Sequence, residues 1–209
     1  MSMRALTRLE SDVAAAIVSF AKVREWEFSA SLEAPQGPLI EIRTLMRPDG
    51  ADPSDTVLAR AKAGGQVVIH HNHLSQESLS DTDWRGLAEL FTETFAHCAD
   101  GTRYWGRVKD PQAVQTVLTK SDLLEIEGGN LLFSSIMNHS HSTDIASFFR
   151  KEILNRAMRL RGYVDYEYVW GALQVPPFGP YALPWSAGDL GKNFDSYIDS
   201  AAAALAPRI

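Results

Sequence analysis

The alternation of helical and strand patterns along the first half of the chain constrains the fold more than any other feature of the sequence. Apolar residues recur at helical spacing over residues 5–22, which predicts an amphipathic helix. Residues 27–32 and 39–46 follow as two predicted strands, separated by a turn rich in Pro and Gly. A short helix from about residue 52 to 62 then precedes an apolar strand at 66–69. This order predicts an α/β or α+β fold in which helices flank a mixed sheet.

The second half of the chain carries a less regular pattern. A stripe at helical spacing runs from Trp84 through Leu87, Phe91 and Phe95 to Cys98, which predicts one helix with Cys98 as an inert buried thiol. Residues 102–108 are expected to form a strand and residues 123–136 one or two further strands. Residues 143–160 are expected to form a helix.

The last fifty residues differ in composition from the rest. We expect residues 1–160 to form a catalytic domain, and residues 161–209 to form a C-terminal extension packed on it. The Tyr, Trp and Pro residues of 163–185 favour core or docking contacts. Their functional alternative is an apolar channel that receives an extended peptide tail.

Composition and charge exclude several classes of protein. The 209 residues suffice for one domain with a full hydrophobic core. A net charge of −6 argues against general nucleic-acid binding, which needs clustered Lys and Arg. The single cysteine excludes an internal disulfide and a cysteine-based zinc ribbon. Because neither a long apolar run nor a signal-peptide pattern occurs, we expect a cytoplasmic protein that does not span a membrane.

The segment VIHHNH, at the end of a predicted strand, holds three of the six histidines. His71 and His73 are two residues apart, so their side chains lie on one face of the strand, whereas His70 points to the other. Asp83 stands at the start of the next predicted helix, where a polar loop can bring it back to both histidines. Two histidines and one carboxylate leave a position for water, which is the pattern of a catalytic zinc.

A zinc-bound water needs a base that accepts its proton. The upstream candidates are Glu25, Glu27, Glu33 and Glu41. Glu25 and Glu27 stand at the entry to a strand, where either can face a pocket. The periodicity alone does not choose between them.

Together these residues resemble the JAMM (MPN+) metalloprotease family. The resemblance rests on H-x-H at His71 and His73 and on S-x-x-D at Ser80 and Asp83. The strand EFSASL, which opens with Glu27, fits the family's E-x-x-G-x-L with alanine in place of glycine. The order of helices and strands fits as well, and the resemblance covers about half of the chain. Two positions depart from the family pattern, since Leu74 replaces a usual proline and the loop before the serine is one residue shorter.

The resemblance implies a JAMM/MPN-like fold with the layering of cytidine deaminases. It implies that zinc binds to His71, His73 and Asp83, that Glu27 is the general base and then acid, and that Ser80 donates to the oxyanion. Its implied activity is hydrolysis of a peptide or isopeptide bond in a protein or peptide substrate. Family members often cut after ubiquitin-like proteins, and bacterial relatives process sulfur carriers.

Other interpretations of the same residues stay open. Ser80 and Asp83 also fit a capping box at a helix start. The chain can instead be a non-catalytic MPN-like binding or scaffold protein. A third class is a DNA-associated protein of RadC type, which the acidic charge disfavours.

Two further groups of residues invite a functional interpretation. His139, His141 and Asp144 can form a second metal or anion site, or a loop in which Ser142 or Thr143 caps the next helix. That helix carries basic residues, expected to form either a solvated face or a surface for a partner or anion, at Arg150, Lys151, Arg156, Arg159 and Arg161.

Overall fold

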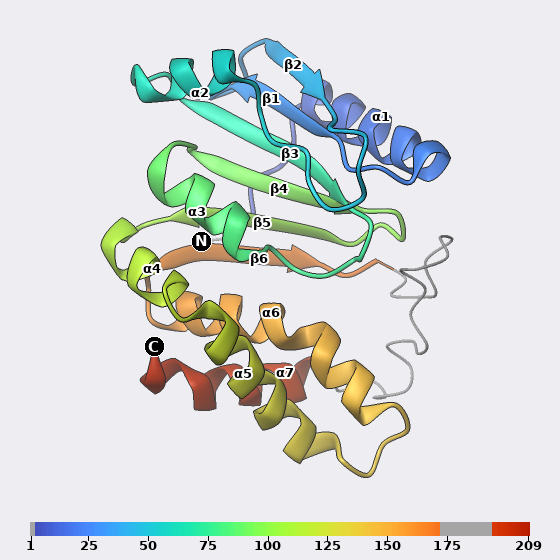
Figure 1. Cartoon of the computed structure of the whole chain (residues 1–209), viewed down its shortest axis with the longest axis vertical. Helices are drawn as coiled ribbons and strands as arrows, with labels where there is room; N and C mark the ends of the chain where they lie inside the picture. The colour runs from blue at the N-terminus through green and yellow to red at the C-terminus, as the bar shows by residue number, and fades with distance from the viewer. Residues whose placement is uncertain (1–2, 172–193) are drawn as a thin grey trace.

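A computed structural model describes residues 3–171 and 194–209 of the chain (Figure 1). The described strands form one mixed sheet in the order β2-β1-β3-β4-β5-β6. Only β3 and β4 pair in parallel, and the other neighbours pair antiparallel. The strand bounds are β1 Ser29–Glu33, β2 Leu39–Arg43, β3 Val67–His73, β4 Glu93–Cys98, β5 Arg103–Val108 and β6 Val164–Val169. The chain is therefore an α/β protein with a mixed sheet, as its sequence predicts.

Helices cover both faces of this sheet. On one face α1 contacts β1, β3 and β4, while on the other α3 contacts β4 and β5. Figure 1 shows α5, α6 and α7 gathered beside β6, where they share one hydrophobic core with α3 and α4. The helix bounds are α1 Arg8–Arg24, α2 Asp55–Lys62, α3 Asp81–Glu89, α4 Pro111–Leu118, α5 Ser121–Ile136, α6 Ser142–Leu160 and α7 Phe194–Leu205, with a final turn η3 at Ala206–Arg208.

β3 is the strand on which the candidate histidines His71 and His73 lie. It is buried along its whole length, because β1 and β4 flank it and helices cover it. Parallel strands need a crossover connection, and α3 supplies it between β3 and β4. The start of α3 is thereby held next to the end of β3.

Most predicted segments of the first half are confirmed with shifted ends. The predicted helix at 143–160 is confirmed as α6, and the strand at 102–108 as β5. The predicted helix from Trp84 to Cys98 is wrong, because α3 ends at Glu89 and β4 begins at Glu93. Cys98 is nevertheless buried, and burial raises the pKa of its thiol. Phe95 and Cys98 continue the helical spacing of the preceding residues by coincidence. They belong to a strand because β4 pairs with β3.

The strands predicted at 123–136 are also wrong, because this segment is the helix α5. Its two glycines disfavour a helix in isolation. A Cβ at Gly128 would lie 2.9 Å from the Ile153 side chain of α6, and one at Gly129 would lie 3.3 Å from the Ala146 carbonyl. The glycines therefore allow α5 and α6 to approach closely, and the tertiary contact outweighs the local preference.

The segment after residue 160 contributes a strand to the sheet and a helix to the group of helices beside it. β6 pairs with β5 as the edge strand of the sheet, and α7 packs against α5 and α6. The predicted aromatic channel of residues 163–185 lies outside the described residues from 172 onward. No helix that the structure describes is long and apolar enough to cross a membrane.

Acidic side chains pair with most of the basic residues predicted as a solvated face or partner surface, and one of these residues is buried. Arg156 is only 1% exposed and contacts Glu152, Asp195 and Asp199 at 2.6–2.7 Å. The remaining pairs are Arg150–Glu125, Lys151–Glu77 and Arg159–Glu167, and Arg161 bonds to the Tyr163 hydroxyl. Arg156 thus joins α6 to α7, whereas the side chains of Arg150 and Arg159 stay partly exposed.

Arg156→Met should lower the free energy of unfolding by about 3–5 kcal/mol, because Glu152 would remain buried without its cation. Chemical denaturation measures this loss. Arg85→Met removes only an exposed pair with Asp81 and serves as the control, with an expected change of about 1 kcal/mol or less. Equal losses in both variants would contradict the structural role of Arg156.

Candidate metal centre

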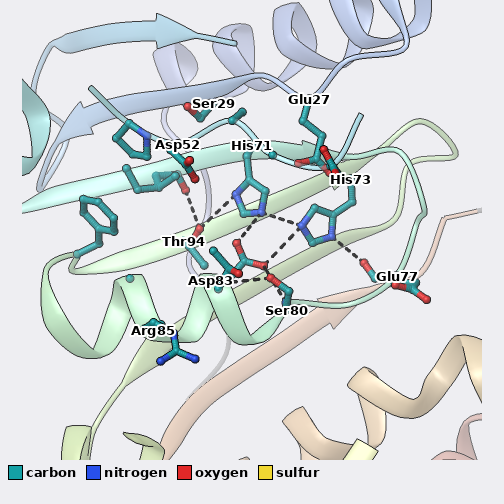
Figure 2. Close-up of a pocket in the computed structure, with 18 of the residues that line it drawn as sticks. Glu27, Ser29, Asp52, His71, His73, Glu77, Ser80, Asp83, Arg85 and Thr94 are labelled. Carbon is teal, nitrogen blue, oxygen red and sulfur yellow. Dashed lines mark hydrogen bonds and ion pairs between the residues drawn. The ribbon is translucent and has the colours of Figure 1, made fainter. Parts of the chain in front are cut away.

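His71 and His73 lie at the end of β3 and face the same side of the sheet, toward α3 (Figure 2). Their alternation along the strand places both imidazoles on one face, and the two Nε2 atoms are 2.8 Å apart. His70 points to the other face, where its Nδ1 lies 3.0 Å from Nε2 of His97. The side chains of His71 and His73 are about one-tenth exposed, so a small ion or substrate atom can reach them from the pocket.

Asp83 completes this group from the first turn of α3. Its Oδ1 lies 3.1 Å from Nε2 of His71, and its Oδ2 lies 3.6 Å from Nε2 of His73. One ligand atom from each of the three side chains lies within 4.8 Å of the others. Within residues 3–171 and 194–209, no other group of three His, Cys, Asp or Glu side chains meets this condition.

Ser80 and Asp83 form the capping box as well. The Ser80 Oγ accepts from the Asp83 N–H at 3.3 Å, while Asp83 Oδ2 accepts from the Ser80 N–H at 2.7 Å and from its hydroxyl at 2.8 Å. The capping interpretation is therefore confirmed, and the same carboxylate faces the histidines. Capping fixes the carboxylate in the orientation that a metal ligand requires.

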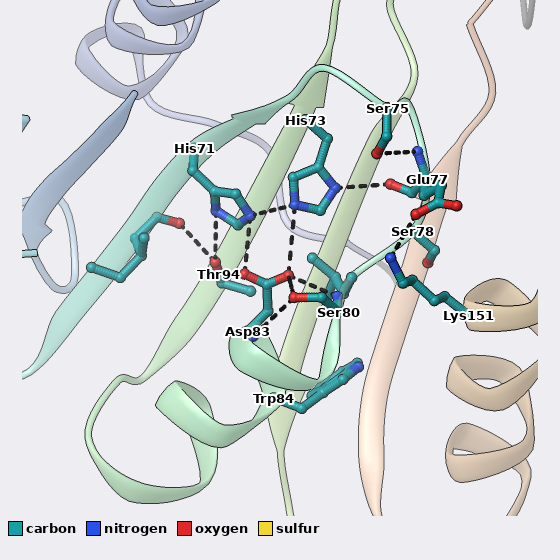
Figure 3. Close-up of polar contacts among 12 residues, drawn as sticks. His71, His73, Ser75, Glu77, Ser78, Ser80, Asp83, Trp84, Thr94 and Lys151 are labelled. Atoms are coloured by element: carbon teal, nitrogen blue, oxygen red, sulfur yellow. Dashed lines mark hydrogen bonds and ion pairs between the residues drawn. The ribbon is translucent and has the colours of Figure 1, made fainter. Parts of the chain in front are cut away.

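Hydrogen bonds at the far side of each ring leave both Nε2 atoms facing each other and Asp83 (Figure 3). His73 Nδ1 donates to the Glu77 carbonyl at 2.8 Å, and a carbonyl can only accept. His71 Nδ1 donates to the Thr94 hydroxyl at 3.4 Å, which in turn donates to the Ile69 carbonyl at 3.3 Å. Two nitrogen lone pairs and a carboxylate thus point at each other, an arrangement that a shared proton or cation stabilises.

The electrostatics of the metal-free group show how strongly it attracts positive charge. Burial lowers the pKa of His73, but hydrogen bonding and the charge of Asp83 outweigh it and raise that pKa to about 9. Burial opposes the charge of Asp83 too, yet the neighbouring histidines hold its pKa well below the usual value. A proton therefore occupies in the free protein the place that a metal ion would take.

Glu27 is the one upstream glutamate of the four candidates that lines the pocket with His71 and His73 (Figure 2). It precedes β1, and its N–H donates to the Arg47 carbonyl at 2.9 Å. Burial raises the pKa of its carboxyl, against the opposing charges of His73 and His71.

The other three glutamates are engaged elsewhere. Glu25 is the exposed C-cap of α1, Glu33 pairs with Arg60 at 2.7 Å, and Glu41 accepts from the Ser54 N–H at 2.8 Å. Geometry thus distinguishes Glu27 where the periodicity of the sequence could not.

The pocket around this group has a volume of about 700 Å³. Its lining includes residues that the sequence interpretation missed, among them Thr94, Glu77 and Lys151. Thr94 reaches His71 only through the pairing of β3 with β4, and Lys151 comes from α6. No local pattern in the sequence marks either of them, because both contacts are tertiary.

The second histidine cluster does not assemble a comparable group. His141 is itself the N-cap of α6, without a side-chain hydrogen bond, so the predicted cap at Ser142 or Thr143 is wrong. Its Nδ1 lies 3.7 Å from a carboxylate oxygen of Asp144, whereas the His139 ring packs edge-on against Tyr197.

No protein-family model matches the chain, and no curated protein matches it. The chemistry of the site therefore has to be inferred from its own residues.

The apparent affinity for zinc should rise with pH across the neutral range and level off above about pH 9. Below that pH the imidazole of His73 holds a proton that zinc must displace, so each metal ion bound should release about one proton near neutral pH. Calorimetry in two buffers of different ionisation enthalpy counts the protons released. A zinc affinity that stays constant between about pH 6 and 9 would contradict this linkage.

Proposed function

We propose that this protein is a zinc-dependent hydrolase of JAMM type that cleaves a peptide or isopeptide bond. The observation that carries the proposal is the convergence of two imidazole nitrogens and one carboxylate beside Glu27 in a single pocket. The likeness of the H-x-H and S-x-x-D segments to the JAMM family supports the same reaction and the same layering of the fold.

The donor set suits zinc. His71 and His73 offer their Nε2 atoms, with His73 doing so once zinc displaces its proton, and Asp83 offers a carboxylate whose lowered pKa keeps it ionised. Three protein ligands of these kinds are typical of catalytic zinc sites. Zinc bound there would polarise the scissile carbonyl and lower the pKa of an attacking water.

Glu27 would move the protons of the reaction. Its place in the pocket lets it take a proton from the attacking water and then give that proton to the leaving amine. Burial raises the pKa of its carboxyl above the ordinary value, the direction found for carboxyls that act as acids and bases in enzymes.

Ser80 would support the developing oxyanion. Its hydroxyl now donates to Asp83, so it must rotate away before it can donate to a substrate. Asp83 Oδ2 keeps the backbone N–H of Ser80 as a partner when this happens. The capping box can therefore persist while the hydroxyl acts on the substrate.

The pocket is large enough for a drug-sized group, and so for a short stretch of extended peptide. It has an apolar part, formed by Leu58, Leu90 and Phe91, and a polar part that includes Ser75 and Lys151. Its volume falls in the range of ligand pockets in proteins. The proposed substrates are peptides and ubiquitin-like or sulfur-carrier proteins with an extended C-terminal tail.

Glu27→Gln should reduce turnover by a factor of about 10²–10⁴ while zinc stays bound, because the amide cannot carry the proton. Cleavage of peptide and ubiquitin-like fusion substrates, with zinc content measured on the same samples, separates the two effects. Glu25→Gln, outside the pocket, is the matched control and should behave as the wild type. Undiminished cleavage by Glu27→Gln would remove Glu27 from its role.

A zinc-loaded wild type that cleaves none of these substrates would instead favour a binding or scaffold protein.

A further inference from the structure

The loop between β3 and α3 carries the carbonyl that orients His73. The Glu77 carbonyl holds the Nδ1–H of this ring, and so turns Nε2 toward His71 and Asp83 (Figure 3). If the peptide of Glu77 moved, the ring would lose the partner that fixes its tautomer and its direction. The question is then what holds Glu77 in place.

Lys151 of α6 holds the side chain of Glu77. Its Nζ lies 2.5 Å from Oε2 of Glu77, although the two residues are 74 positions apart in the sequence. Within the loop, the backbone N–H of Glu77 also donates to the Ser75 hydroxyl at 3.3 Å. The ion pair is the contact that ties Glu77 to a helix of the core.

Asn155, one turn after Lys151, holds the next two residues of the loop. Its Nδ2 lies 2.9 Å from both the Ser78 Oγ and the Leu79 carbonyl. Side chains four residues apart lie on the same helix face. One face of α6 therefore contacts three consecutive loop residues, Glu77, Ser78 and Leu79.

The same face also reaches the helix that carries Asp83. The indole N–H of Trp84 donates to Oδ1 of Asn155 at 2.7 Å, and Trp84 directly follows Asp83. Tyr166 of β6 adds a 2.6 Å bond to the Ser78 hydroxyl. The position of α6 thus bears on two of the three proposed zinc ligands.

We propose that Lys151 is a positioning residue of the metal centre, which acts through Glu77 on the tautomer and direction of His73. This inference rests on the proposed zinc site. Both members of the ion pair are 22% exposed, so we expect the pair to contribute less to the free energy of unfolding than the buried pair of Arg156 and Glu152. Partners behind a metal ligand, in contrast, typically change metal affinity by 10–100-fold when they are removed.

The first test is the zinc affinity of Lys151→Met, measured by competition with a chelator. It should fall about 10-fold or more, with a thermal unfolding midpoint close to that of the wild type. Lys151→Arg keeps the charge that faces Glu77 and should restore most of the affinity. Arg150→Met is the matched control, because Arg150 pairs with Glu125 instead of the loop, and its affinity should equal that of the wild type.

A double-mutant cycle shows whether Lys151 acts through Glu77. Glu77→Gln leaves the backbone carbonyl in place but removes the charge that Lys151 binds, so it should lower the affinity as much as Lys151→Met does. The double variant should then bind zinc no more weakly than either single variant. Additive losses would overturn the proposed route.

A readout without metal separates this inference from the proposed function. In alkaline solution, where the His73 imidazole is neutral, the ¹⁵N shifts of the metal-free wild type should show the Nδ1–H tautomer that the Glu77 carbonyl fixes, and those of Lys151→Met a mixture. Unchanged shifts and an unchanged zinc affinity in Lys151→Met would overturn the positioning role while the zinc site stands. If Lys151→Met changes the ¹⁵N shifts of His73 but the wild type binds no zinc, the positioning role would be supported and the zinc site refuted.

Discussion

The side chain of Asp83 is the constraint on which the rest of the site depends. One carboxylate oxygen closes the capping box with Ser80, and the carboxylate as a whole faces His71 and His73. The start of α3 is therefore coupled to the geometry of the histidines, and neither can shift without the other. A buried carboxylate without such partners would protonate or turn to solvent.

β3 has several polar residues although it is buried along its whole length. Its last four residues are polar, and each has a partner: His97 for His70, Thr94 for His71, backbone groups of Trp26 and Phe28 for Asn72, and Glu77 for His73. Buried polar groups are tolerated when they are hydrogen-bonded. The partners come from β4, from the segment before β1 and from the loop that α6 supports, so the sheet and the C-terminal helices together hold the site. The helices that follow β5 are thus part of the architecture of the site.

The sequence predicts the centre of the site because its geometry is local. Two histidines two residues apart on a strand share a face whatever the rest of the chain does, and a serine three residues before an aspartate caps a helix. The position of the proposed base and the supporting contacts are not local. Glu27 lines the pocket and donates its N–H to the Arg47 carbonyl, whereas Glu25 caps α1. Lys151 meets Glu77 across 74 residues of sequence. The prediction of the fold fails for the same reason at α5. Its glycines disfavour a helix in isolation and are explained only by the close contact with α6.

The most direct test of the account is the zinc content of the purified protein, measured by elemental analysis and compared with that of the His71→Ala/His73→Ala variant. The account predicts about one zinc ion per chain in the wild type, because one group of three ligands is present in the described residues, and none in the variant. Wild type purified with zinc and without chelator that still holds no metal, or a variant that retains it, would contradict the assignment of this site.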